Sequence, residues 1–116
     1  LCIHANGTLA VAADPIDGSS NVDANITLGT IFSILPALAG GADGSSFMQP
    51  GRNQLAAGFA VYGPFTSLVV TVGAGTQIFS LDPDDRKFYR TLYSVAIPAV
   101  TSEFAINSSN YRHWED

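Results

Sequence analysis

Two aspartates, Asp14 and Asp17, stand three residues apart directly after the uncharged apolar run Thr8–Ala13. Such a run is typical of a buried strand, and Pro15 disfavours the helical conformation for the residue before it, so we expect Asp14 to project from the strand end. Carboxylate oxygens are the ligands that Mg²⁺ prefers in proteins. Two carboxylates beside a core strand cost stability unless a cation or hydrogen-bond donors compensate them. The spacing therefore predicts a divalent-metal site.

The residues that follow the carboxylates predict an anion site beside the metal. Gly18 allows the backbone to turn, and Ser19, Ser20 and Asn21 are residue types that commonly begin a helix. Their first N–H groups would face the oxygens of a phosphate ester, and the carbonyl of Ile16 would add a hard metal ligand. Each half has an ordinary alternative, because Asp before Pro often marks only a turn and Gly-Ser-Ser only a loop or cap. Together, after an uncharged strand, they favour metal-assisted phosphate chemistry.

The elements around this stretch are expected to be mainly strands. Asn6-Gly7 predicts a hairpin of residues 1–5 with 8–13, and Gly29–Leu35 predicts an interior strand after an irregular or helical connector at 22–28. Residues 36–46 form a small-residue loop. Its second Asp-Gly-Ser-Ser, at 43–46, follows no strand and is interpreted as a surface loop.

One helix is expected from Gln49 to about Tyr62, because Leu55, Phe59 and Tyr62 have helical spacing and Gly63-Pro64 would end it. Short turn-rich links then predict an antiparallel meander of strands at 67–72, 76–81 and 87–93, with the acidic run 82–85 as a solvated turn. Further extended pieces are expected at 95–98 and 103–106. This order indicates an α+β fold with a mixed or largely antiparallel sheet.

Composition limits the partners. Of the 116 residues, 47% are hydrophobic and only 13% charged, which suggests surfaces that more protein normally covers. The net charge of −5, with five basic residues, argues against a nucleic-acid partner. Every long apolar run is interrupted before membrane-spanning length. Cys2 is the only cysteine, so no internal disulfide forms and a reducing, cytoplasmic setting is expected.

The string DPIDGSSN, continued by VDANITLGTIFSIL, resembles the class I fructose-1,6-bisphosphatases in a bacterial or plastid-like form. The resemblance extends to QPGRNQLAAGFAVYGP, IFSLDP and FAINSSNYRHW further along the chain. It implies the layered α-β-α-β-α sandwich of the sugar phosphatases. It also implies an internal fragment near the middle of a subunit, with residues 1–102 in the N-terminal domain and 103–116 beginning a C-terminal substrate domain.

The resemblance also implies roles for individual residues. It makes Asp14 and Asp17 catalytic and gives as metal ligands Asp14, the carbonyl of Ile16, and Asp17. It places at the 1-phosphate Asp17, Gly18, Ser19 and Ser20. Asn107 and Tyr111 match the pair at the 6-phosphate, although the family often has one residue fewer between them. The family's upstream acidic residues and its downstream Glu and Lys/Tyr/Arg set do not occur in this chain.

The activity implied is Mg²⁺-dependent hydrolysis of fructose 1,6-bisphosphate to fructose 6-phosphate and phosphate, in gluconeogenesis or the Calvin cycle. Two or more ions are expected per site, with Mn²⁺ as a substitute, in a cytoplasmic homo-oligomer, a tetramer by resemblance, and the chain is expected to be inactive alone. A sedoheptulose-1,7-bisphosphatase or dual enzyme is the close alternative. An inositol-phosphatase-like enzyme is disfavoured, because Ser19 stands where that group has Thr. A non-catalytic module would be expected to lose one of the two carboxylates.

Overall fold

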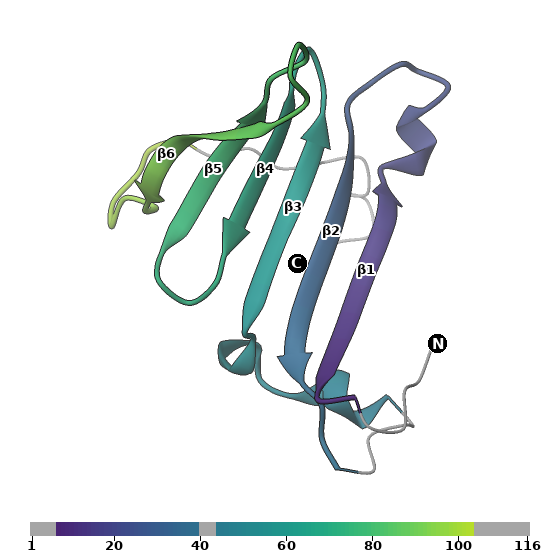
Figure 1. Ribbon diagram of the computed structural model, residues 1–116, viewed down its shortest axis with the longest axis vertical. Coiled ribbons are helices and arrows are strands. Elements are labelled where there is room, and N and C mark those ends of the chain that lie inside the picture. The colour runs from purple at the N-terminus through teal and green to yellow at the C-terminus, as the bar shows by residue number, and fades with distance from the viewer. Residues whose placement is uncertain (1–6, 40–43, 104–116) are drawn as a thin grey trace.

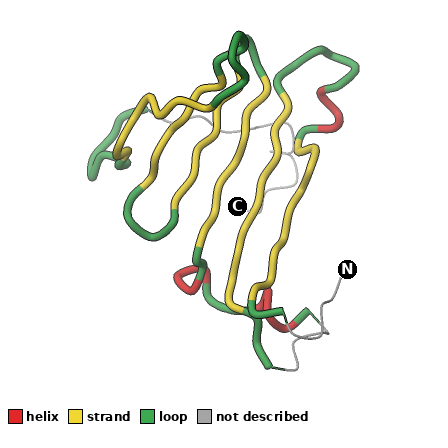
Figure 2. Tube along the Cα trace, in the orientation of Figure 1, coloured by secondary structure: helices red, strands yellow, loops and turns green. Residues whose placement is uncertain are grey.

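The computed structural model describes residues 7–39 and 44–103, which form one six-stranded sheet with the strands side by side in chain order (Figure 1). Every neighbouring pair is antiparallel. Short connections require this for the links from β3 to β6. The strands are β1 (Leu9–Asp17), β2 (Leu28–Pro36), β3 (Ala56–Tyr62), β4 (Thr66–Thr71), β5 (Thr76–Leu81) and β6 (Phe88–Val95). Helical structure in these residues is limited to the single 3₁₀ turns η1 (Ser19–Asn21), η3 (Ser45–Met48) and η4 (Gly51–Asn53), as Figure 2 shows.

The expected strand at 29–35 and the meander of β4, β5 and β6 are confirmed. The acidic run between β5 and β6 is a turn, in which Asp82 Oδ1 accepts the Asp84 N–H at 2.9 Å. Asp85 accepts from the Tyr89 hydroxyl at 2.6 Å and from Lys87 Nζ at 3.2 Å. The Tyr89 hydrogen bond lowers the pKa of the Asp85 carboxyl and raises that of the Tyr89 phenol. These carboxylates therefore stabilise a turn.

The helix expected from Gln49 to Tyr62 is wrong. The first part is one 3₁₀ turn, η4, and the second is β3, which pairs with both β2 and β4. Phe59 and Tyr62 have helical spacing but lie on opposite faces of β3, and hydrogen bonds to two neighbours outweigh the helix propensity of Ala. Gly58, which lowers helix propensity, allows this close pairing, because a Cβ there would lie 2.5 Å from the Val69 carbonyl oxygen and 2.8 Å from Phe32 Cζ.

Other expectations are corrected in part. Among the described residues, the partner of β1 is β2, and the hairpin expected with residues 1–5 stays a prediction because those residues lie outside the described part. Of the extended pieces expected at 95–98 and 103–106, Val95 is the last residue of β6, residues 96–103 form no strand, and 104–106 lie outside the described residues. The 43–46 copy is not simply a surface loop: Ser46 is buried, and its hydroxyl accepts the Leu38 N–H at 3.0 Å. Residue 43 itself lies outside the described part.

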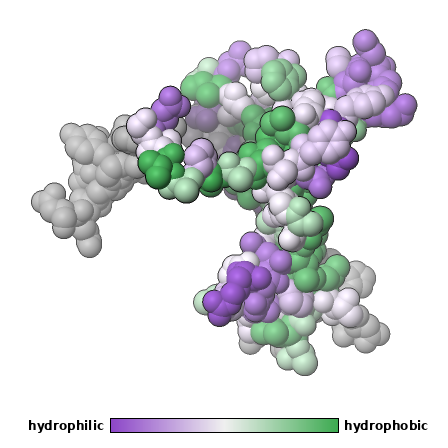
Figure 3. All heavy atoms as spheres, turned by 90° about the vertical axis from the view of Figure 1, so that its left-hand side faces the viewer, coloured by the Kyte–Doolittle hydropathy of each residue, from purple (hydrophilic) through white to green (hydrophobic). Residues whose placement is uncertain are grey.

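The sheet has little core of its own. Among the described residues, Leu35 is the only buried hydrophobic side chain, with 4% exposed. The run Thr8–Ala13, expected to be buried, is largely exposed because, in the part of the chain that the structure describes, β1 lies at the edge of the sheet and little packs over it. Val11 (58% exposed) lies on one face, and Ile31 (46%) and Phe59 (44%) lie on the other. Figure 3 shows hydrophobic side chains at the surface. Exposed hydrophobic side chains on both faces are typical of surfaces that pack against other protein segments.

None of the helical segments in the described residues has the length and hydrophobicity needed to cross a membrane.

Candidate phosphate and metal site

A β-bulge lies between the two predicted carboxylates. Asp14 is opposite Ile31 on β2, whereas Asp17 is opposite Gly29, so the interval of three residues on β1 matches two on β2. In a regular strand, residues three apart point to opposite faces of the sheet. The extra residue of the bulge reverses this, and Asp14 and Asp17 come to lie on the same face, the one that carries Ile31. The bulge therefore makes one site out of two carboxylates that the strand period would separate.

Local hydrogen bonds hold the bulge. Asp14 Oδ1 accepts the Ile16 N–H at 3.2 Å, and the carbonyl of Pro15 accepts the Thr30 hydroxyl at 2.8 Å. The Thr30 hydroxyl also lies 2.7 Å from the Tyr62 hydroxyl on β3. Pro15 has no N–H to donate to β2, which is why proline in sheets is confined to edges and bulges. Pro15 thus indicates the bulge as well as the extended conformation of Asp14.

The turn after β1 is tight. Gly18 adopts a left-handed conformation (φ 85°, ψ 29°), which favours glycine, and the expected helix start is the single turn η1. The N–H of Asn21 closes the turn on the Gly18 carbonyl at 2.7 Å, and that of Val22 donates to Ser19 at 3.2 Å. The amides of Gly18, Ser19 and Ser20 come before these donors in the chain. At the start of a helical turn, such N–H groups have no acceptor within the turn.

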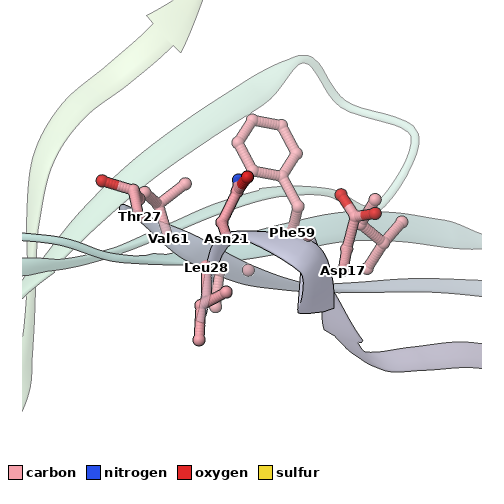
Figure 4. A pocket seen from close by; sticks show the side chains of 10 residues that line it. Asp17, Asn21, Thr27, Leu28, Phe59 and Val61 are labelled. Carbon is pink, nitrogen blue, oxygen red and sulfur yellow. The ribbon is translucent and has the colours of Figure 1, made fainter. Parts of the chain in front are cut away.

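A pocket of about 220 Å³ lies where this turn meets β2 and β3. Its polar side chains are Asp17, Asn21 and Thr27, and its apolar wall includes Ile31, Phe59 and Val61. Figure 4 shows Asp17, Asn21 and Phe59 pointing to one side of the sheet and Leu28 to the other. The lining residues Ile31, Phe59 and Val61 share a face of the sheet with Asp17, as the strand register requires. Sequence reasoning missed this wall, because it depends on β3, which was expected to be a helix.

The predicted residues fall into three groups. Asp17 and Gly18 line the pocket, and Asp14 lies on the same face of β1 without contributing to the lining. Ile16, Ser19 and Ser20 belong to the bulge and the turn and do not line the pocket. Asn107 and Tyr111 lie outside the described residues, so their predicted role at a second phosphate stays a prediction.

The donor set fits a hard divalent cation in part. Asp14 and Asp17 are exposed and share a face, and their carboxylate oxygens are of the type that Mg²⁺ and Mn²⁺ prefer. No cluster of three or more His, Cys, Asp or Glu side chains suited to a metal ion occurs in residues 7–39 and 44–103. Mg²⁺ takes six oxygen ligands, so further ligands are needed beyond these two carboxylates.

Comparison with known proteins gives consistent matches. Residues 2–92 match the family model described as "Fructose-1-6-bisphosphatase, N-terminal domain". The chain is 54% identical over 113 residues to a class 1 fructose-1,6-bisphosphatase of Shewanella sp. (strain W3-18-1), covering 97% of this chain and 34% of the relative. It is 58% identical over 112 residues to that of Acidiphilium cryptum, covering 95% of this chain and 32% of the relative. The chain thus spans about a third of the length of these relatives.

Solved structures agree. The holo form of Leishmania major fructose-1,6-bisphosphatase matches with a TM-score of 0.82 and 36% identity, covering 94% of this chain and 36% of that one. Its apo form matches with a TM-score of 0.79 and 35% identity, covering 94% of this chain and 37% of that one. These matches confirm the expected fold class, of which the described residues form an antiparallel sheet with few helical turns.

Proposed function

The chain belongs to the fructose-1,6-bisphosphatase family, and on that premise we propose that it forms the metal- and phosphate-binding part of an enzyme that hydrolyses fructose 1,6-bisphosphate to fructose 6-phosphate and phosphate. The observation that carries the proposal is the bulge, which places Asp14 and Asp17 on one face beside the turn at Gly18. A strand without a bulge would leave the second carboxylate on the other face. The family relationship supports a role in gluconeogenesis, and the Calvin cycle is the alternative setting.

We propose Mg²⁺, with Mn²⁺ as a substitute, as the cofactor, in two or more sites. Asp14, Asp17 and the carbonyl of Ile16 would supply part of the ligands, and the remainder would come from outside this chain. Such ions neutralise phosphate charge and activate water by Lewis-acid catalysis. Family membership is consistent with a divalent-metal requirement, and the shared face of the two carboxylates supports their joint use.

The proposed task of the chain's own residues is to receive the phosphate that is removed. The amides of Gly18, Ser19 and Ser20 would donate hydrogen bonds to the phosphoryl oxygens, where negative charge develops during the reaction. The left-handed conformation of Gly18 turns the backbone directly after Asp17. The three amides therefore belong to the turn that follows the carboxylate. Asn107 and Tyr111 are proposed for the 6-phosphate from the resemblance.

The wider setting is also a proposal. It comprises the domain boundary near residue 102, a cytoplasmic location and a homotetramer. The exposed apolar residues on both faces of the sheet, such as Val11 and Phe59, support burial of this segment within a larger fold.

The test is phosphate release by the full-length protein with Mg²⁺ from equal concentrations of fructose 1,6-bisphosphate, sedoheptulose 1,7-bisphosphate and inositol 1-phosphate. We expect fructose 1,6-bisphosphate to have the highest kcat/KM and EDTA to abolish its hydrolysis. Comparable or faster hydrolysis of sedoheptulose 1,7-bisphosphate would favour the dual or sedoheptulose enzyme. Turnover confined to inositol 1-phosphate, or unaffected by EDTA, would contradict the proposal.

A further inference from the structure

A chain of hydroxyl contacts crosses three strands behind the carboxylates. The Thr30 hydroxyl on β2 donates to the carbonyl of Pro15 on β1 at 2.8 Å and lies 2.7 Å from the Tyr62 hydroxyl on β3. A threonine hydroxyl has one proton, so with Thr30 donating to Pro15, Tyr62 must be the donor to Thr30. Gly29 and Ile31 lie opposite Asp17 and Asp14 and share their face of the sheet. Thr30 stands between them on β2, so its side chain points to the other face. These hydroxyls thus contact the bulge from behind.

The bulge needs such a contact because its register is weakly held. Among residues 7–39 and 44–103, β1 has β2 as its one strand neighbour, and Pro15 lacks the N–H that would join it to β2. A shift of one residue moves every following side chain to the other face of a sheet. At this point a shift would move Asp17 away from Asp14, while the strand itself would remain paired.

We propose that Thr30, supported by Tyr62, is a positioning residue that holds the Pro15 bulge in the register in which Asp14 and Asp17 share a face. Thr30 acts through the backbone of β1, on the side away from the carboxylates. This inference rests on the proposed function, since it takes the two carboxylates to be joint ligands of a divalent ion. Its direct consequence is metal affinity, and any effect on turnover follows from that.

The sheet contains a matched control. The Thr91 hydroxyl on β6 donates to the carbonyl of Ile78 on β5 at 3.2 Å, beside the register shift between Ile78 and Phe79. It is the same kind of contact, from threonine to a carbonyl across an irregular strand pair, at the sheet edge far from β1. A valine at either position keeps the branched shape and removes the hydroxyl.

The experiment measures Mn²⁺ binding to the full-length protein, by the loss of the free Mn²⁺ signal in electron paramagnetic resonance, together with the Mg²⁺ dependence of fructose 1,6-bisphosphate hydrolysis. For Thr30→Val we expect the Mn²⁺ dissociation constant to rise about tenfold, the size of effect that one lost hydrogen bond produces. The half-saturating Mg²⁺ concentration should rise by a similar factor, with kcat at saturating Mg²⁺ changed far less. Thr30→Ser should restore binding, Tyr62→Phe should weaken it about threefold, and Thr91→Val should leave it unchanged.

Unchanged Mn²⁺ affinity in Thr30→Val, or an equal loss in Thr91→Val, would overturn the positioning role. If Thr30→Val does not fold, Tyr62→Phe decides, because unchanged binding in that variant overturns the role as well. Asp14→Asn and Asp17→Asn separate the two proposals. Loss of Mn²⁺ in both, with normal binding in Thr30→Val, rejects only the positioning role. Normal binding in both Asp variants, or a wild-type protein that does not hydrolyse the substrate, rejects the proposed function and the inference with it.

Discussion

Replacing Asp17 or Asp14 with Ala in the full-length protein is expected to lower Mg²⁺-dependent phosphate release about a thousandfold. Each substitution removes a proposed metal ligand, and the several kcal/mol of charge stabilisation that a metal supplies in the transition state correspond to a factor of this size. Both side chains are exposed, so the fold should remain. Steady-state assays at saturating Mg²⁺, with circular dichroism as the check on folding, measure the effect.

The second Asp-Gly-Ser-Ser sequence provides the matched control, Asp43→Asn. It changes the same tetrapeptide where no second aspartate stands three residues upstream, and activity within a small factor of wild type is expected. Near-normal turnover in Asp14→Ala or Asp17→Ala would refute the metal assignment. A loss in Asp43→Asn as large as that in Asp17→Asn would show that the second copy also takes part.

The chain of 116 residues expressed by itself is expected to release no phosphate from fructose 1,6-bisphosphate with Mg²⁺. Its described residues bring together two carboxylates and no larger acidic or histidine cluster, which is too few ligands to hold Mg²⁺ ions firmly. The family's water-activating acids are expected outside the chain. Phosphate-release assays on the purified chain, beside the full-length protein, test this expectation. Metal-dependent turnover that disappears in an Asp14→Ala version of the chain would contradict it.

The isolated chain should also associate with itself. Val11, Ile31 and Phe59 are 44–58% exposed, and β1 and β6 are the edges of the sheet that residues 7–39 and 44–103 form. Light scattering after size exclusion, with binding of a hydrophobic dye, measures this. A monodisperse monomer that does not bind the dye would show that the sheet needs no cover.

The metal motif was predictable from the sequence, and its geometry was not. Asp14, Asp17 and Gly18 are adjacent in the chain, so local residue chemistry is enough to identify them. Their common face depends on which residues of β2 lie opposite them, and this register is a long-range property. Pro15 marks a bulge only once β1 is known to pair with β2. The apolar wall at Phe59 and Val61 was missed for the same reason.

Some strands were predictable from local sequence, and one depends on long-range pairing. β4, β5 and β6 are joined by short turns of Gly, Asp and Pro, and their order follows from those local signals. β3 has alanines that suit a helix, and only its pairing with two neighbours makes it a strand. Phe59 and Val61 are residue types that favour a strand, and at Gly58 there is no room for a Cβ between Phe32 and the Val69 carbonyl.

The central claim is that Asp14 and Asp17 share one face in order to share a divalent ion. The most direct measurement is the anomalous scattering of Mn²⁺ in crystals of the full-length protein. We predict a peak with one carboxylate oxygen of each aspartate at about 2.1 Å, close to the distances of Mg²⁺ sites. A Mn²⁺ peak bound by only one of the two, or well-ordered carboxylates with no Mn²⁺ between them, would contradict the account.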